Sequence, residues 1–451
     1  MSCNAIPLPY ALNAAVTAYG AIADMPWAMW LDSGGMGRYD ILCAQPVTTL
    51  LTCNGRTEIC ADGARQYSDA DPFDLIRAQL GAAATPEPDI PFAGGALGYW
   101  GYDLARGAMA LPQGAAQAMP DMAIGIYDWA IVIDHQARQS HLVSRQRNAG
   151  TARRLPDILQ RLQGACAAPA AVFRVTSPAV SNLNRERYAA AFARVQDYLR
   201  AGDCYQVNLA QRFSADVTGD ASSAYLELRR LNPAPYSALL NIPQGQILCV
   251  SPERFLRVRD GHVETRPIKG TRPRGSDAVQ DEQLAEELRR HPKDRAENLM
   301  IVDLLRNDLS KNCATGSVRV SQLFDVESYS NVHHLVSTVE GRLAEGRDAL
   351  HLLRDCFPGG SVTGAPKRRA MQIIDELEPD RRGVYCGAIG YAGFDGNMDS
   401  NIAIRTLART QDKIHCWAGG GLVADSVMEA EYQETLDKAA GMLAWLRRYG
   451  I

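Results

Sequence analysis

Two pairs of acidic residues have a spacing that could hold a divalent cation. Asp294 with Glu297, and Glu431 with Glu434, are each three positions apart, which places both carboxylates of a pair on one face of a helix. Because Mg²⁺ needs only one or two carboxylates beside water and an oxygen-rich substrate, one carboxylate from each helix would suffice. The alternative is two solvated acidic helix faces, since Asp and Glu are common at protein surfaces.

The segment that follows Glu297 favours the metal site. Residues 300–309 are too apolar for a helix that lies wholly at the surface. We therefore expect Glu297 at the point where its helix enters the core. A carboxylate carried toward the interior needs a cation or another partner.

Lysine is rare in this chain, which makes each lysine a candidate for amine chemistry. An amine can lose its proton when it is desolvated and can then act as a nucleophile, whereas a guanidinium stays protonated. Lys269 precedes Gly270 in the basic turn 266–274, where burial and neighbouring positive charge would both lower its pKa. The alternative is a lysine in an exposed turn. Of 47 basic residues only six are lysines, namely Lys269, Lys293, Lys311, Lys367, Lys413 and Lys438.

Two glycine-rich segments and a histidine pair complete the candidates. Residues 357–367 and 418–423 could bind an anion through backbone N–H groups, but neither matches the Walker or dinucleotide fingerprint, and tight turns are the alternative. His333 and His334 lie in a strand-like run, so their imidazoles face opposite sides and at most one points inward. An inward histidine could be catalytic or simply hydrogen-bonded in the core.

Periodicity and capping signals indicate the elements that must position these residues. Apolar spacing predicts helices over 71–80, 153–162, 185–199, 282–309 with a break at Pro292, 367–377 and 430–448. Short apolar runs predict strands at 38–42, 130–133, 246–250 and 263–268. The link 167–181 is the only plausible boundary, so we expect an N-terminal region over 1–170 and a catalytic region over 182–451.

Composition restricts the class of protein. The 451 residues carry a formal charge of −4 and are 46% hydrophobic, which is typical of a globular chain with a large core and argues against a nucleic-acid partner. Eleven scattered cysteines without a CxxC pair suit reduced thiols rather than a zinc site. No charged leader and no uncharged apolar run of membrane-spanning length is visible, so we expect a cytoplasmic protein without a membrane partner.

Five motifs occur in an order that resembles the chorismate-utilising enzymes. The resemblance covers residue 184 to the C-terminus, and 31–33 (LDS) with 94–99 (GGALGY) extend it to nearly the whole chain. It implies an α/β (α+β) fold, a two-sheet β sandwich with outer helices, in which the two regions interleave. The motifs are 251–255 (SPERF), 266–271 (RPIKGT), Glu297 with 300–308 (MIVDLLRND), 361–367 (SVTGAPK) and Glu434-Thr435.

The resemblance also implies roles for the candidate residues. Glu297 and Glu434 would hold Mg²⁺, supported by Asp294 and Glu431. Lys269 as a free amine would attack ring carbon 2 of chorismate while Glu253, as general acid, protonates the departing 4-hydroxyl. His334 and Ser361 would orient the ring or its leaving group. The side-chain carboxylate of chorismate would be held by Tyr385, Arg405, Lys438 and the N–H groups of Gly419, Gly420 and Gly421.

Two positions separate the branches of this family, and a third departs from the family pattern. Lys269 is typical of the branch that forms 4-amino-4-deoxychorismate for 4-aminobenzoate and folate synthesis, where anthranilate-forming relatives resemble Pro-Ile-Ala-Gly-Thr. Gln206 stands where isochorismate-forming relatives have a lysine that activates water, and an amide cannot be that base. Asn298 departs from the family, which often has His after the metal-binding glutamate, so the resemblance implies the metal ligands but not the residue that supports them at this position.

The resemblance further implies a partner and a regulatory site. Because no segment resembles a glutaminase, ammonia would come from a separate glutamine amidotransferase subunit. In some relatives the equivalents of Leu31, Asp32, Ser33, Pro233 and Tyr236 form a tryptophan pocket, and its retention here stays open. The rival interpretations are component I of anthranilate synthase, and a non-catalytic subunit that senses tryptophan or binds the glutaminase.

Overall fold

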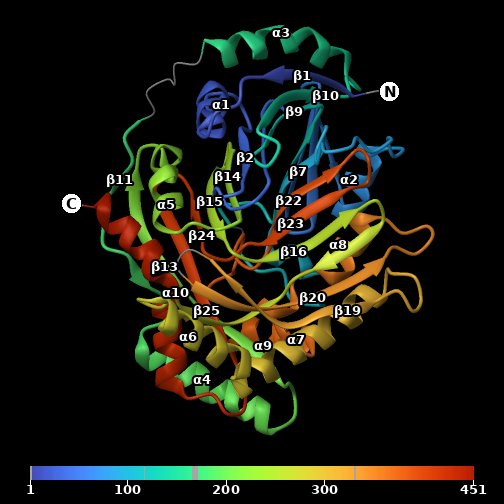
Figure 1. The fold of residues 1–451 in the computed structure, drawn as a ribbon. Coiled ribbons are helices and arrows are strands. Elements are labelled where there is room, and N and C mark those ends of the chain that lie inside the picture. The colour runs from blue at the N-terminus through green and yellow to red at the C-terminus, as the bar shows by residue number, and fades with distance from the viewer. Residues whose placement is uncertain (1–2, 116, 165–170, 330–331, 451) are drawn as a thin grey trace.

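Two large antiparallel sheets face each other in the centre of the molecule (Figure 1). The computed structural model describes residues 3–115, 117–164, 171–329 and 332–450. Over those residues the first sheet has thirteen strands, in the order β1 (Asn4–Leu8), β10 (Gln139–Ser144), β9 (Trp129–Asp134), β3 (Tyr39–Cys43), β2 (Met29–Asp32), β14 (Tyr236–Ile242), β15 (Gly245–Ser251), β24 (Thr406–Arg409), β25 (Lys413–Leu422), β13 (Gln206–Thr218) and β11 (Arg174–Val175), with β12 (Val180–Ser181) and β21 (Gly364–Ala365) also paired to β13.

The second sheet has twelve strands in the same described ranges. Their order is β18 (Ile268–Pro273), β20 (Val332–Arg342), β17 (His262–Thr265), β16 (Arg254–Arg259), β23 (Met398–Ile402), β22 (Ala388–Gly393), β7 (Gly95–Trp100), β8 (Met122–Tyr127), β4 (Thr48–Cys53), β5 (Arg56–Ala61) and β6 (Ala64–Ser68), and β19 (Arg319–Ser328) pairs with β20. Figure 1 shows the orange-red β22 beside the blue β7, and β2 pairs in the same way with β14. Each sheet therefore contains strands from both ends of the chain.

Helices lie outside the sheets. They are α1 (Ala14–Ile22), α2 (Pro72–Leu80), α3 (Ala149–Gln163), α4 (Arg185–Arg200), α5 (Tyr225–Leu231), α6 (Ala278–Arg290), α7 (Pro292–Ser310), α8 (Ala349–Cys356), α9 (Lys367–Leu377) and α10 (Met428–Arg448), with short 3-10 turns η1 (Tyr102–Ala105), η2 (Ala221–Ala224) and η3 (Gly360–Val362). Among the residues described, no helix has the length and hydropathy needed to cross a bilayer.

The core is divided between the inter-sheet space and the outer faces. One apolar cluster joins Met29 and Leu240 of the first sheet to Leu97 and Ile389 of the second. A second cluster packs α1, α3, α5 and α10 against the first sheet, a third packs α2, α7 and α8 near the second, and a fourth packs α4 and α9 on β13 of the first sheet. This arrangement confirms the expected sandwich with outer helices.

Local sequence explains several element boundaries. Asp71 accepts a hydrogen bond from Phe73 N and Pro72 opens α2, while Pro292 opens α7 and so separates it from α6. The predicted strand 263–268 is wrong in one respect, because it is divided at Arg266-Pro267 into β17 and β18. The predicted link 167–181 falls partly on residues 165–170, which lie outside the described residues, and the domain boundary stays a prediction.

Helix α7 differs from the expectation that it enters the core. Ile301, Val302 and Leu305 are buried, but Leu299 and Asp303 on the same helix are exposed. The helix is therefore amphipathic and lies on β18 and β20 with one face. The apolar run reflects a wide packed stripe and not a helix surrounded by protein.

Candidate active site

A cavity of about 620 Å³ brings together residues from distant motifs. It is bordered by β18 and β20 of the second sheet, by β25 of the first sheet, and by helices α7 and α10. The cavity is lined by every predicted site residue outside the tryptophan set, with one exception. Gly420 does not line it, although Gly419 and Gly421 on either side of it do. The lining set is Lys269, Glu253, His334, Ser361, Tyr385, Arg405, Gly419, Gly421, Lys438, Glu297, Glu434, Asp294 and Glu431.

Glu253 is a buried carboxyl group with an unusually high proton affinity. It follows β15, and its main chain is fixed because its N–H donates to Ser251 Oγ and its carbonyl accepts from Ile402 N. Burial raises the pKa of its carboxyl to about 7, although Ser361, Lys269 and Lys438 act in the opposite direction. Such a group holds a proton at neutral pH and can also release it, as a general acid must.

Lys269 faces this carboxyl from β18. Within the described chain its ammonium makes no hydrogen bond and no ion pair. Desolvation lowers its pKa, Lys438 lowers it further, and Glu297, Glu253 and Glu434 oppose that shift. An unpaired lysine of lowered pKa in a cavity has the properties of a nucleophilic amine.

The histidine pair obeys the alternation of strand β20. His333 points away from the cavity but is buried as well, with its two ring nitrogens 2.8 Å from Ser328 Oγ and 3.0 Å from Asp281. The imidazoles therefore face opposite sides, but the expectation that at most one of them points inward is wrong, because both are buried. His334 faces the cavity, with Nδ1 2.9 Å from the hydroxyl of Thr271. Burial lowers the pKa of His334 to about 4, and Arg405 adds to that effect. His334 is therefore neutral near pH 7.

One wall of the cavity is acidic and contains one lysine. Lys293 Nζ lies 3.8 Å from Glu297 Oε1 and 3.6 Å from Glu431 Oε1, so a single cation spans helices α7 and α10. Burial raises the pKa of Glu297, and Glu431 and Asp294 raise it further. Burial alone would raise the pKa of Glu434, but Lys438 at 2.5 Å lowers it overall.

The carboxylates of the acidic wall could supply some of the ligands of a cation, with water supplying the others. In the described ranges no three acidic, histidine or cysteine side chains are close enough to form a complete metal cage. Asp294 is engaged on one side, since its Oδ2 lies 3.3 Å from Arg272 and 3.0 Å from His291. Facing carboxylates that already attract Lys293 match the preference of Mg²⁺ for one or two carboxylates plus water and substrate oxygens.

The cavity also offers cations and backbone N–H groups, of which Lys438 lies beside the acidic wall because it pairs with Glu434. Within the described residues, Arg405 makes no side-chain hydrogen bond and no ion pair, and its φ of +48° is uncommon for a residue other than glycine. Tyr385 stacks on Trp417 at 5.9 Å between ring centroids. Lys438 Nζ donates to Gly419 O at 3.0 Å. These groups can hold an anion by charge and by hydrogen bonds.

The three glycines lie inside a strand and not in a turn. Gly419, Gly420 and Gly421 belong to β25 and pair with β13, whereas β24 pairs with β25 only up to Cys416. Alternate N–H groups of an antiparallel strand point away from a given neighbour, so this edge has N–H groups available to the cavity. A Cβ on Gly420 would lie 3.2 Å from Glu431 Oε2 and 3.7 Å from Glu434 Oε1.

The six lysines divide into two groups. Lys269, Lys293 and Lys438 line the cavity. Lys311 and Lys367 both pair at 2.8 Å with the buried carboxylate of Asp308, and Lys413 pairs with Asp216 at the surface. The rarity of lysine therefore singled out the three lysines that line the cavity, but equally the three that form ion pairs elsewhere.

Several contributors were missed or only partly anticipated from the sequence. Asn208 lines the cavity and no local signal distinguished it, while Lys293 was marked only as one of the rare lysines. Asn298 does not line it, because its Oδ1 accepts a 2.6 Å hydrogen bond from Ser337 beneath α7. Gln206 is fully buried beside Gly421, and neither polar atom of its amide has a hydrogen-bond partner in the described structure.

A second cavity, of about 460 Å³, lies beside the predicted tryptophan residues. Leu31, Asp32, Ser33 and Tyr236 line it, whereas Pro233 does not and Pro235 does. The Asp32 carboxylate already accepts hydrogen bonds from Tyr225 and Arg229, so it forms part of the wall. Tryptophan binding there stays a prediction.

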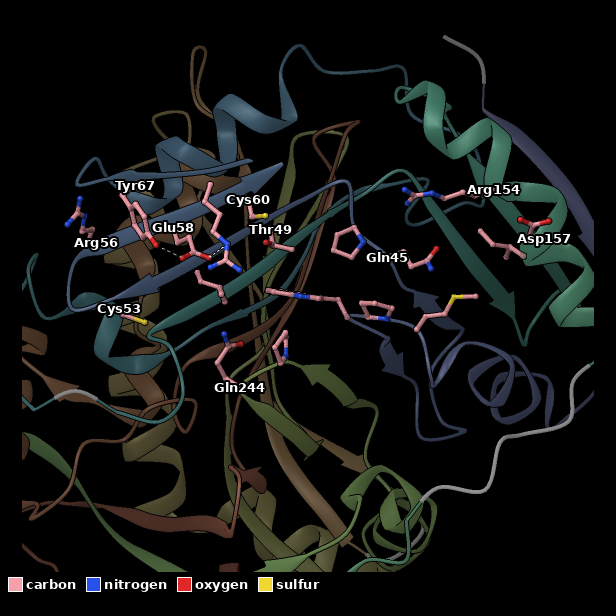
Figure 2. A pocket seen from close by; sticks show the side chains of 18 of the residues that line it. Gln45, Thr49, Cys53, Arg56, Glu58, Cys60, Tyr67, Arg154, Asp157 and Gln244 are labelled. Atoms are coloured by element: carbon pink, nitrogen blue, oxygen red, sulfur yellow. Dashed lines mark hydrogen bonds and ion pairs between the residues drawn. The ribbon is translucent and has the colours of Figure 1, made fainter. Parts of the chain in front are cut away.

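A larger cavity, of about 1120 Å³, contains none of the predicted site residues. In Figure 2 it lies between Glu58 and Tyr67 on the sheet side and Arg154 and Asp157 on helix α3. Tyr67 donates a 2.8 Å hydrogen bond to Glu58. Its side chains lack the pairing of a high-affinity acid with an unpartnered lysine that marks the smaller cavity.

Comparison with known proteins agrees with this geometry. The profile of the chorismate binding enzymes matches residues 27–444, and the chain belongs to this family. It is 49% identical to aminodeoxychorismate synthase component 1 of Salmonella typhimurium, over 98% of both chains, and 48% identical to the protein of that name from Escherichia coli, over 99% of both. The crystal structure of anthranilate synthase component I from Streptococcus pneumoniae superposes with a TM-score of 0.78 at 34% identity, covering 90% of this chain and 92% of that one.

Proposed function

We propose that this chain converts chorismate and ammonia to 4-amino-4-deoxychorismate, the activity named for its relatives at 48–49% identity. One observation carries the proposal, namely an unpartnered Lys269 of lowered pKa in the same cavity as Glu253, whose pKa is about 7. The two groups supply a nucleophile and an acid at neutral pH. The product serves the synthesis of 4-aminobenzoate and folate.

The first displacement uses both side chains. The free amine of Lys269 forms a bond to ring carbon 2, the double bond shifts, and the carbon–oxygen bond at carbon 4 breaks. Glu253 gives its proton to the departing oxygen, which leaves as water, and the alkylated amine loses one proton. Ser361 donates a hydrogen bond to Glu253 and so fixes the direction of the acid.

The second displacement restores the lysine. Ammonia forms a bond to carbon 4, the double bond shifts back, and the bond between Lys269 and carbon 2 breaks. The attacking nitrogen loses one proton and the departing lysine nitrogen gains one, so that Lys269 leaves as a neutral amine. Two displacements with allylic shift place nitrogen at carbon 4, which a single attack at carbon 2 cannot do. This requirement is a chemical reason for an amine at position 269.

The remaining cavity residues bind and orient the substrate. Glu297 and Glu434 would hold Mg²⁺, with Asp294 and Glu431 as supporting carboxylates, and the ion would neutralise the ring carboxylate when bound. Arg405, Lys438, Tyr385 and the N–H groups of Gly419, Gly420 and Gly421 would hold the side-chain carboxylate. His334, neutral because its pKa is about 4, would orient the ring by hydrogen bonding without adding positive charge.

The ammonia would come from a separate glutamine amidotransferase subunit. The similar proteins are named as component 1 of their synthases, which agrees with a further component. With ammonium salts the chain alone should be active, whereas glutamine should support turnover only in the presence of that subunit.

Product identity is the decisive experiment. The protein is incubated with chorismate, ammonium and Mg²⁺, the products are separated, and their masses are measured by mass spectrometry. We expect 4-amino-4-deoxychorismate without fluorescent anthranilate. Anthranilate would instead favour the activity named for the Streptococcus pneumoniae structure, and the absence of any chorismate turnover would favour a non-catalytic subunit.

Substitution of Lys269 tests the covalent step. Lys269→Arg keeps a positive charge but cannot present a free amine, so we expect turnover to fall by roughly a thousandfold or more in both Lys269→Arg and Lys269→Ala. Lys413→Ala, which removes a surface lysine, is the control. Without ammonia, the intact wild-type chain should gain the mass of chorismate minus water, and the variants should not. Unchanged turnover in Lys269→Ala would refute the covalent route.

A further inference from the structure

Arg382 is a buried cation that does not line the candidate active site but contacts residues that do. It lies in the loop between α9 and β22, and its side chain is 1% exposed. Removing a charge from water is costly, so its hydrogen bonds must be nearly complete. The partners of this guanidinium are therefore informative.

The planar group makes five hydrogen bonds at once, the longest of them from Nη2 to Asn208 Oδ1 at 3.4 Å. Nε lies 2.9 Å from Glu378 Oε2 and Nη2 lies 2.6 Å from Glu378 Oε1, which is a bidentate ion pair. Nη1 donates to Val362 O at 2.8 Å, and Nη2 donates to Asn208 O at 2.8 Å. A lysine has no planar fork with which to satisfy these acceptors together.

The same residue pair fixes aromatic and strand positions. The guanidinium carbon lies 4.8 Å from the ring centre of Tyr102 and 5.7 Å from that of Tyr385. Glu378 Oε1 also accepts a 2.9 Å hydrogen bond from Ala210 N on β13. Arg382 with Glu378 thus joins β13, the turn η3 and Tyr385.

Three of the residues that Arg382 contacts connect it to the cavity, namely Val362, Asn208 and Tyr385. Val362 directly follows Ser361, whose hydroxyl donates a 2.8 Å hydrogen bond to Glu253. Asn208 and Tyr385 line the cavity, and Asn208 N also donates to Thr363 O in the same turn. A shift of the Val362 carbonyl would move the hydroxyl that orients the acid.

We propose that Arg382 is a positioning residue for the chorismate reaction, which holds the turn at Ser361 against Glu253 through its hydrogen bonds to Val362 and Asn208. The inference rests on the proposed function of the cavity. It assigns no contact between Arg382 and substrate. Arg382 acts through Ser361, so its loss changes the rate of chemistry more than substrate affinity.

Arg382→Lys tests this role while keeping the charge opposite Glu378. We expect kcat to fall roughly 10- to 100-fold, as a small misplacement of a catalytic group can cause, with KM changed less than about threefold. Ser361→Ala and the double variant complete a cycle. If Arg382 acts through Ser361, the double variant should lose little more than the worse single variant, whereas independent losses would multiply.

A second pair of variants separates positioning from folding. Arg382→Met combined with Glu378→Met removes both buried charges together, which often leaves stability unchanged or improved. We expect near-normal thermal unfolding with the same loss of kcat. Arg106→Lys, another buried arginine paired with Asp103 and Asp375, is the control and should change kcat less than about twofold.

Chorismate consumption is the measured rate, so the test is valid whichever product the wild-type enzyme forms. Wild-type kcat in a folded Arg382→Met, Glu378→Met variant would overturn the proposal. Multiplying losses in the cycle with Ser361→Ala would also overturn it. If Arg382→Lys does not fold, the paired methionine variant decides alone. A wild-type product other than aminodeoxychorismate would refute the proposed function and leave the positioning result readable.

Discussion

The hydroxyl of Ser361 donates a 2.8 Å hydrogen bond to Oε1 of Glu253, although the two residues are far apart in the sequence and belong to different motifs. This bond lowers the pKa of a carboxyl that burial raises to about 7. Other groups that act on Glu253 are the ammonium groups of Lys269 and Lys438. Ser361 therefore orients the proposed proton donor and, after burial, has the largest effect on its pKa.

Ser361→Ala should shift the pH dependence of the reaction. Without the hydroxyl, the carboxylate form of Glu253 loses a hydrogen bond and its pKa rises further above 7. Because the acid must be protonated, the fall in kcat/KM on the alkaline side should begin at higher pH than in the wild type, while the maximal rate drops roughly tenfold. Rate profiles from pH 5 to 9 measure this. A shift of that limb to lower pH would contradict the assignment.

Glu253→Gln should stabilise the protein at alkaline pH while abolishing activity. The folded-state pKa of about 7 lies above the ordinary value of 4.5, so the native state binds the proton more tightly than the unfolded chain. Its contribution is fully present below about pH 4.5 and is lost as pH rises through 7. Glutamine removes that loss, and the gain in unfolding free energy at pH 8 should reach at most about 3 kcal/mol. Denaturant unfolding at pH 5 and pH 8 checks it. An equal effect at both pH values would contradict it.

Glu434→Gln should raise the Mg²⁺ concentration needed for half-maximal activity by about tenfold or more, because it removes the charge of a proposed oxygen ligand. Glu429→Gln on the same helix is a matched control, since Glu429 is exposed and pairs with Arg185. Mg²⁺ titrations of both variants provide the measurement. Equal Mg²⁺ requirements in the two would exclude Glu434 as a ligand.

Lys293→Met should strengthen Mg²⁺ binding. Lys293 lies between Glu297 and Glu431, and its removal leaves facing carboxylates without a compensating cation. We expect about two- to fivefold tighter Mg²⁺ binding, since charge pairs of this exposure contribute at most about 1 kcal/mol. The increase in unfolding temperature on Mg²⁺ addition, compared with the wild type, measures this without any activity assay. Weaker binding would show that Lys293 supports the cation site.

Two neighbouring glycines should respond differently to alanine. A Cβ at Gly419 would lie 2.7 Å from Leu209 O, in the backbone of the paired strand, so Gly419→Ala should lower stability by about 1–3 kcal/mol. At Gly420 the Cβ meets only the carboxylates of Glu431 and Glu434. Gly420→Ala should therefore fold normally and mainly raise the Mg²⁺ requirement. Thermal unfolding with Mg²⁺ titration distinguishes them, and equal destabilisation would contradict the difference.

Local sequence predicted the helices and strands better than it predicted the contacts between them. The limits of α9 agree with apolar spacing over 367–377, and strand alternation predicted that His333 and His334 face opposite sides, although both are buried. Periodicity could not show that Gly419, Gly420 and Gly421 continue a strand, because glycine has no side chain to alternate. Their place in β25 depends on pairing with β13, which is distant in sequence.

A residue of the site could be predicted from the sequence where its type was chemically unusual. It could not be predicted where its role depends only on contacts that the fold creates. Lys269 stood out because lysine is rare here. Arg382 is one arginine among many, and its importance comes from carbonyls at Asn208 and Val362 that only the fold brings together. The resemblance to a known family supplied residue roles that no periodicity could provide.

The pairing of β7 with β22 has a consequence for synthesis on the ribosome. β7 emerges early and pairs with β8 soon afterwards, but its other edge stays open until nearly the entire polypeptide has been translated. An unpaired edge is a template for association with other nascent chains. Slow translation of the last hundred or so codons should therefore increase aggregation of this protein, whereas a chaperone that shields β-edges should reduce it.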